Sequence, residues 1–181
     1  MRLKNQSLVF KMTLLALNLA LFIVLNYASF NLQFVKFSAK GLPVIFVAVI
    51  FGPIEGMLLG GVGEFLCQLV SPYGLTPTTA LWILPWIVQG LIVGLLFKQK
   101  DVKEHPVLWI ITVIICCLAV TGLNTLVMWI DGLIMQYNPN LTKINILIRF
   151  GGSIASAILY MLVVPVLFEP LIRQGKLEKS D

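Results

Sequence analysis

The chain has 181 residues, of which 59% are hydrophobic and only 12% are charged. Soluble domains average about 45–50% apolar and about 25% charged residues, so a soluble fold of this chain would expose too much apolar surface. The net charge of +5 is explained by basic residues in loops on one side of a membrane and does not require a nucleic-acid partner. We therefore expect an all-α integral membrane protein with one membrane domain over residues 1–181.

The first apolar stretch runs from about Val9 to Ala28, which is about the length that a helix needs to cross a bilayer. It is too long for a signal-peptide core and has no convincing cleavage site, so we interpret it as a retained helix. Ala16 and Ala20 lie one turn apart on the same face. Such a pair allows close approach of another helix, either within this protein or from a partner.

Two apolar segments follow, and Gly52-Pro53 separates them. The first covers roughly 42–51 and is short for a span, so we expect it either to begin earlier, near Phe34, or to lie tilted and partly buried. The second covers roughly 54–70. Because four glycines thin one of its sides, that side should pack against protein. These glycines are Gly56, Gly60, Gly61 and Gly63.

An acidic residue, Glu64, lies inside this second segment. An ionisable group within a span is costly and is therefore a candidate functional residue. Gly61, Glu64 and Gln68 share one face by their spacing. The spacing is compatible with ligand binding by Glu64, and also with a structural ion pair to Arg149 or a lysine.

Three more helices are expected, over about 79–97, 107–130 and 146–167, with Thr78 or Thr79 capping the first of them and an outer loop over 132–145. Six spans place both termini on one side of the membrane. Nine basic residues lie on that side and four on the other, so the termini are predicted to be cytoplasmic. The nine are Arg2, Lys4, Lys11, Lys98, Lys100, Lys103, Arg173, Lys176 and Lys179, and the four are Lys36, Lys40, Lys143 and Arg149.

Several kinds of chemistry have no sequence motif here. The chain has no Walker lysine loop, no dinucleotide-binding glycine motif and no converging serine, histidine and acid, so we expect neither an enzyme nor catalytic residues. The three cysteines, Cys67, Cys116 and Cys117, fall in apolar segments and read as buried small side chains. The single histidine, His105, lies in a charged loop. We expect no metal and no cofactor.

Polar and aromatic side chains gather at the outer ends of the predicted helices. Basic groups there would suit a ligand with carboxylate or phosphate groups, although single basic and aromatic residues are also typical of membrane interfaces. The candidate substrate-binding residues are Asn26, Lys36, Glu64, Gln68, Tyr73, Trp82, Asn124 and Arg149.

Over nearly its whole length the sequence resembles the substrate-binding S components of energy-coupling factor (ECF) vitamin transporters. Ala16-x-x-x-Ala20 is similar to the family's docking motif. The stretches KFSAKGLP and FGPIEGMLLGGVGE resemble the helix 2–3 region of the folate-type branch, and PYGLTPTT and QGLIVGLLFK resemble its third loop and fourth helix. The chain departs from that branch at LTPTTALWILPW, where the branch has an FPGFT-like stretch.

The resemblance implies a six-helix substrate-binding subunit in a bacterial cell membrane. Ala16 and Ala20 would dock on a transmembrane coupling subunit that is driven by two ATPase subunits. Cobalamin-type S components are similar in outline, so a corrinoid is the first expectation for the ligand and folate the second. The alternative function is a stand-alone secondary transporter of a small metabolite, although no inverted repeat or proton-relay chain is visible.

Overall fold

The computed structural model describes the backbone of residues 2–3, 8–27, 31–32, 35–36, 39–72, 74–97, 105–136, 139–173 and 177–178, and the side chains of 8–27, 39–72, 74–97, 105–136, 144, 146 and 148–167. These parts of the chain form six helices and four two-residue strands. The helices are α1 (Leu8–Tyr27), α2 (Gly41–Ile50), α3 (Pro53–Leu69), α4 (Thr79–Phe97), α5 (Pro106–Ile134) and α6 (Pro139–Arg173); the strands are β1 (Arg2–Leu3), β2 (Asn31–Leu32), β3 (Val35–Lys36) and β4 (Leu177–Glu178).

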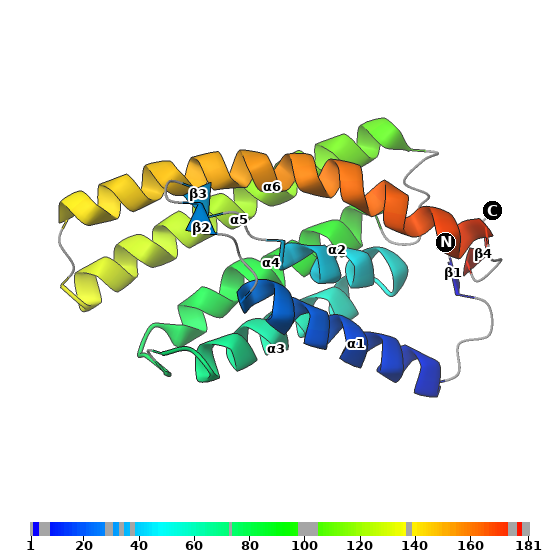
Figure 1. Ribbon diagram of the computed structural model, residues 1–181, viewed down its shortest axis with the longest axis horizontal. Helices are drawn as coiled ribbons and strands as arrows, with labels where there is room; N and C mark the ends of the chain where they lie inside the picture. The colour runs from blue at the N-terminus through cyan, green and yellow to red at the C-terminus, as the bar shows by residue number, and fades with distance from the viewer. Residues whose placement is uncertain are drawn as a thin grey trace.

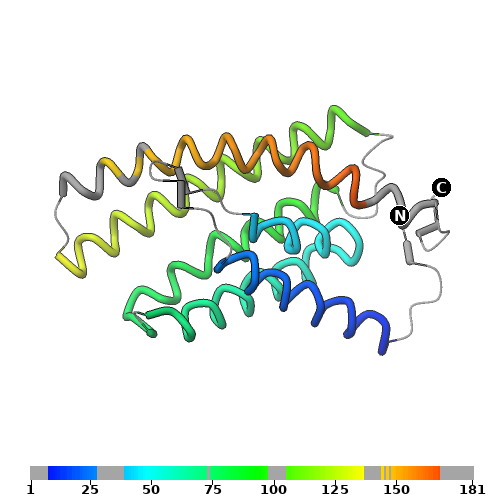
Figure 2. Tube along the Cα trace, in the orientation of Figure 1, coloured from blue at the N-terminus to red at the C-terminus, as the bar shows by residue number. Residues whose placement is uncertain are grey.

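Consecutive helices alternate in direction, and α5 and α6 form a long antiparallel pair beside the other four (Figure 1; the Cα trace in Figure 2 shows the same arrangement). We call these two parts the α1–α4 body and the α5–α6 hairpin. Strand β1 pairs with β4, which brings the two ends of the chain together, and β2 pairs with β3. Within the described residues, α1, α4, α5 and residues 148–167 of α6 are long and apolar enough to cross a membrane. The chain is thus a multi-pass helical membrane protein.

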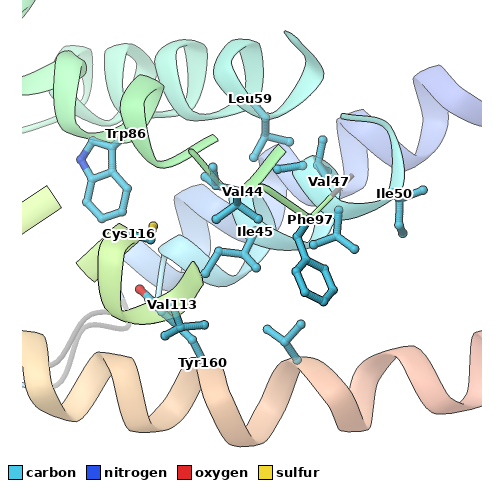
Figure 3. Packing of buried hydrophobic residues seen from close by; sticks show 14 of the residues in the cluster. Val44, Ile45, Val47, Ile50, Leu59, Trp86, Phe97, Val113, Cys116 and Tyr160 are labelled. Atoms are coloured by element: carbon cyan, nitrogen blue, oxygen red, sulfur yellow. The ribbon is translucent and has the colours of Figure 1, made fainter. Parts of the chain in front are cut away.

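The short helix α2 lies at the centre of the fold. Eight of its ten residues are buried, and Val44, Val47 and Ile45 point between Leu59 of α3 on one side and Tyr160 of α6 on the other (Figure 3). A helix that is apolar on every side must be covered on every side. The segment is therefore a buried core helix, and for this reason it can be shorter than a membrane span.

Glycines allow α3 and α4 to approach backbone to backbone. A Cβ on Gly60 would collide with the backbone of Trp86, a Cβ on Gly90 with the backbone of Gly56, and a Cβ on Gly94 with Pro53. Toward the other neighbours of α3, a Cβ on Gly56 would come within 2.7 Å of the Ala48 Cβ. The prediction that the glycine side of this helix packs against protein is confirmed. We call the α3–α4 contact the glycine seam.

Several predicted boundaries differ from those observed. Helix α2 does not begin near Phe34, because residues 35–36 form β3 and α2 starts only at Gly41. Helix α5 continues to Ile134 and α6 already begins at Pro139, so the predicted outer loop over 132–145 is mostly helix. Hydropathy marks only the part of a helix that lies in apolar surroundings, so it misses polar turns that extend beyond it.

Candidate functional site

A buried ion pair joins three helices of the body near the outer end of α1. The Lys40 Nζ atom, just before α2, lies 2.7 Å from Glu64 Oε2 of α3 and 3.0 Å from Asn26 Oδ1 of α1. The second carboxylate oxygen of Glu64 accepts a hydrogen bond of 3.1 Å from Gln68 Nε2. The Lys40 ammonium also lies over the Trp86 ring, 4.3 Å from its centroid. We call Asn26, Lys40, Glu64, Gln68 and Trp86 the Lys40 cluster.

The ion pair between Lys40 and Glu64, at the centre of the Lys40 cluster, is almost completely buried. The side chains of Lys40 and Glu64 are only 12% and 6% exposed. Removing one member of such a pair leaves the other charge buried without compensation, which is far more costly than the pair itself. Glu64 therefore forms a structural ion pair, one of the two roles that its position allowed. Its partner is Lys40 and not Arg149.

A second cation stacks on the same face of α4. The Arg149 guanidinium of α6 lies 5.1 Å from the centroid of the Trp82 ring, and Trp82 precedes Trp86 by one helical turn. Successive turns of α4 therefore carry one indole each, and each indole faces a cation from another helix. Among the described residues Arg149 has no carboxylate within salt-bridge distance.

Helix α5 contributes two polar side chains that face α4. Asp131 is buried and accepts a hydrogen bond of 2.5 Å from the Thr78 hydroxyl at the start of α4. Asn124 lies seven residues earlier on the same face of α5 and is half-buried. Since the rise is about 1.5 Å per residue, Asn124 is at about the depth of the two indoles. Toward α6, the Thr121 hydroxyl donates a hydrogen bond of 2.6 Å to the hydroxyl of Ser153, which lies one turn from Arg149.

A second buried polar contact lies next to the Lys40 cluster. The Tyr160 hydroxyl of α6 hydrogen-bonds the Gln89 side chain of α4 and the backbone of Gly41, the residue after Lys40. Gln89 is 2% exposed and Tyr160 is 4% exposed. Because Gln89 follows Trp86 by about one turn, this contact closes the region below the indoles toward the core.

The structure brings together most of the residues predicted for the substrate site. Asn26, Glu64 and Gln68 meet in the Lys40 cluster, Arg149 lies over the Trp82 ring, and Asn124 lies on α5 at about their depth. For Lys36 only the backbone is described, as part of β3, and Tyr73 lies outside the described residues.

Sequence reasoning left four residues of this region out of the predicted site: Lys40, Trp86, Thr78 and Asp131. Lys40 and Trp86 did carry a signal, because one is an outer basic residue and the other lies one turn from Trp82. Thr78 was expected as a helix cap, as was Thr79. Instead the Thr78 hydroxyl bonds Asp131, while the Thr79 hydroxyl accepts the backbone N–H of Thr76 at 2.9 Å.

The predicted docking pair and the cysteines have distinct environments. Ala16 and Ala20 are both exposed on α1, whereas Cys67, Cys116 and Cys117 are buried and unpaired, as predicted. In the part of the chain that the structure describes, no three His, Cys, Asp or Glu side chains are grouped to hold a metal. A shallow depression lies at the start of α5, lined by His105, Pro106, Val107, Leu108 and Ile111.

These features define a helical membrane protein with a polar, aromatic region buried between its helices. A family model described as "ECF-type riboflavin transporter, S component" matches residues 7–173. The chain therefore belongs to this family. No curated protein matches the chain at a significant level.

Membership of this family makes the chain the substrate-binding S component of an ECF-type transporter, a transport subunit and not an enzyme. An S component of this kind has a vitamin ligand and works with a coupling subunit and ATPase subunits. The ranking of a corrinoid over folate finds no support, because the matching family is described by riboflavin. A polar rim with aromatic residues suits many mixed-polarity ligands, so it could not by itself choose among vitamins.

Proposed function

We propose that this chain captures riboflavin at the outer face of a bacterial cell membrane and releases it inward after docking on the coupling subunit. The observation that carries the proposal is the family match, which covers residues 7–173 of 181. The chain contains no ATP-binding motif, so the energy for uptake would come from the two ATPase subunits.

The chemistry of the region between α4 and the hairpin suits a flavin. The isoalloxazine ring is flat, with polar atoms along one edge, and the ribityl chain carries hydroxyl groups. Trp82 offers an indole face for stacking, whereas Trp86 is buried beneath the Lys40 ammonium. Arg149 and Asn124 offer donors and acceptors at the same depth, so one ligand could stack and hydrogen-bond at once.

The predicted site residues divide into two groups in this proposal. Trp82, Asn124 and Arg149 would contact the flavin. Asn26, Glu64 and Gln68 would form the adjoining wall, because their polar atoms already bond one another and Lys40. Lys36 and Tyr73 remain predicted ligand contacts from the outer loops.

The membrane topology follows the same proposal. Six crossings, with both termini in the cytoplasm, agree with the alternating helix directions and with the excess of basic residues at the inner ends. The ten residues of α2 cover only about 15 Å, roughly half of the hydrocarbon thickness. This helix would therefore cross in the interior of the protein and not in contact with lipid. Ala16 and Ala20, exposed on α1, would form part of the docking face.

A binding measurement tests the substrate. The purified full-length chain should quench riboflavin fluorescence in a saturable way, because a flavin stacked on an indole loses emission. Cyanocobalamin and folate, added in excess, should fail to compete. Saturable binding of either competitor, with no riboflavin binding, would replace riboflavin as the substrate.

A transport measurement tests the partners. In liposomes, riboflavin uptake should require the coupling subunit and both ATPases together with ATP. Uptake by the chain alone would instead establish a stand-alone secondary transporter.

A further inference from the structure

Helix α1 is the least enclosed helix of the body. Of its twenty residues, only Asn18 and Phe22 are buried. Its large apolar side chains at Leu17 and Val24 are 65% and 60% exposed. A helix with so little burial has few packing contacts that define its rotation about its own axis.

Three polar or aromatic contacts of α1 lie on one face, beside partly buried apolar side chains that pack against the core, namely Leu14, Leu15, Leu19 and Ile23. At the inner end Lys11 Nζ is 2.5 Å from Glu55 Oε1 of α3. In the middle, the Phe22 ring fills the space over Gly63, whose added Cβ would lie 2.8 Å from it. At the outer end Asn26 accepts the hydrogen bond from Lys40. Lys11, Phe22 and Asn26 span about 22 Å along the helix.

The inner contact involves two elements of the body. Lys11 pairs with Glu55 in the first turn of α3, where the helix dipole favours a carboxylate. The same ammonium lies 5.5 Å from the centroid of the Phe51 ring, at the end of α2. Lys11 is thus fixed at the turn between α2 and α3. Side-chain exposures of 30% for Lys11 and 20% for Glu55 show that lipid and water reach the pair only in part.

Ala16 and Ala20 lie on the opposite face of α1. At 3.6 residues per turn they are about half a turn around the helix from Lys11 and Phe22, and both are exposed. A close helix–helix contact through alanines depends on the rotation of the helix, because the bulkier Leu17 and Leu21 follow the alanines at about 100° around the axis. The contacts of the buried face therefore decide where the alanines point.

We propose that the Lys11–Glu55 ion pair is a positioning contact that sets the rotation of the inner half of α1 and so presents Ala16 and Ala20 to the coupling subunit. This inference rests on the proposed docking role of that face. Lys11 and Glu55 need not touch the partner; they act through the orientation of α1. The outer contact with Lys40 belongs to the substrate region, so the two ends of α1 serve different steps.

The test separates assembly from substrate binding. The tagged full-length chain is co-expressed with its coupling subunit and ATPases, and the recovered coupling subunit is measured beside the riboflavin affinity of the isolated chain. Lys11→Met and Glu55→Gln should lower recovery by up to about fivefold, the range expected for one partly exposed ion pair. Riboflavin affinity should stay within about twofold of the wild type.

Two controls make the result specific. Lys11→Arg keeps the charge and should assemble normally, and the exchange Lys11→Glu with Glu55→Lys should restore most of the recovery lost in either single variant. Unchanged recovery in Lys11→Met, or a parallel loss of assembly and riboflavin binding, overturns the inference. A wild-type chain that assembles but binds no riboflavin refutes the proposed substrate alone, and a wild-type chain that does not assemble refutes the docking premise.

Discussion

Glycine has opposite roles in the α1–α4 body and in the α5–α6 hairpin. In the glycine seam, a methyl group on Gly60 or Gly90 would run into the backbone of the facing helix. In the hairpin, a Cβ on Gly122 of α5 or Gly151 of α6 would meet no described atom within 4 Å. The seam is therefore a backbone contact that cannot adjust, whereas Gly122 and Gly151 leave room.

The two regions also differ in how they are tied together. The body contains two ion pairs among its described residues, Lys11–Glu55 and Lys40–Glu64. The hairpin is joined to α4 by side-chain contacts, among them Thr78 with Asp131, Arg149 with Trp82 and Phe97 with Trp109. In the proposed function, a ligand bound between these regions would meet one firm wall and one wall that side chains can rearrange.

The firmness of the body is tested most strongly at its buried charges. Lys40→Met should lower the free energy of unfolding by about 3–5 kcal/mol, because Glu64 is left as an uncompensated buried charge. Thermal unfolding of the purified protein in detergent, followed by light scattering or tryptophan emission, measures the loss.

The double variant Lys40→Met with Glu64→Leu provides the control. Apolar replacement of both members of a buried pair is often neutral or better, so most of the stability should return. If riboflavin binding returned with it, the pair would be structural only; lost binding in a stable double variant would assign Lys40, Glu64 or both a contact with the ligand.

The glycine contrast itself is tested by matched alanine substitutions. Gly90→Ala should destabilise the protein by about 3 kcal/mol, since the clash is with backbone and no rotamer relieves it. Gly122→Ala, in open space within a helix, should instead stabilise by about 0.5–1 kcal/mol. Equal melting temperatures for the two variants would contradict the description of α3–α4 as a close seam.

The hairpin side of the proposed substrate site is tested at Trp82. Trp82→Ala removes a stacking surface and should weaken riboflavin binding by about 1–3 kcal/mol, the range measured for aromatic stacking on a flat heterocycle. Fluorescence titration measures the effect, and Trp82→Phe should keep most of the affinity. Trp129, 59% exposed on α5, offers a matched control, because Trp129→Ala should leave binding unchanged.

The smallest loss is expected where one hydrogen bond joins the hairpin to the body. Thr78→Val keeps the shape of the side chain but removes the donor to Asp131, and should cost about 1 kcal/mol. Hydrogen exchange should become faster at the outer end of α5 more than in α3. Uniformly faster exchange in both helices would mean that the hairpin and the body do not open separately.

Much of the fold was predictable from the sequence because hydropathy and glycine spacing are local signals. The limits of α1, α3 and α4 were predicted to within one residue or so of those observed. The start of α5 was predicted to within one residue, but its end and both limits of α6 were not, because the missed turns are polar and no local signal distinguishes such turns from a loop.

The candidate site was predictable in membership more than in arrangement. The described members of the predicted site lie near one end of the bundle, and the spacing of Glu64 and Gln68 placed them on one face. Which basic residue pairs with Glu64 could not be derived, because Lys40 and Glu64 are 24 positions apart and local periodicity carries no information on that distance.

The sequence by itself determined that the chain is a helical membrane protein, that Gly52-Pro53 separates two helices, and that Ala16 and Ala20 share a face. These properties depend on composition and on neighbours within a few turns. The enclosure of α2 by its neighbours, and the contacts of Lys40 with Asn26, Glu64 and Trp86, are visible only in the folded chain. The folded chain also shows that each of two successive indoles on α4 faces a cation from outside α4. Such contacts arise from the packing of distant segments, where the cost of burying a charge or a bare backbone selects one partner among several.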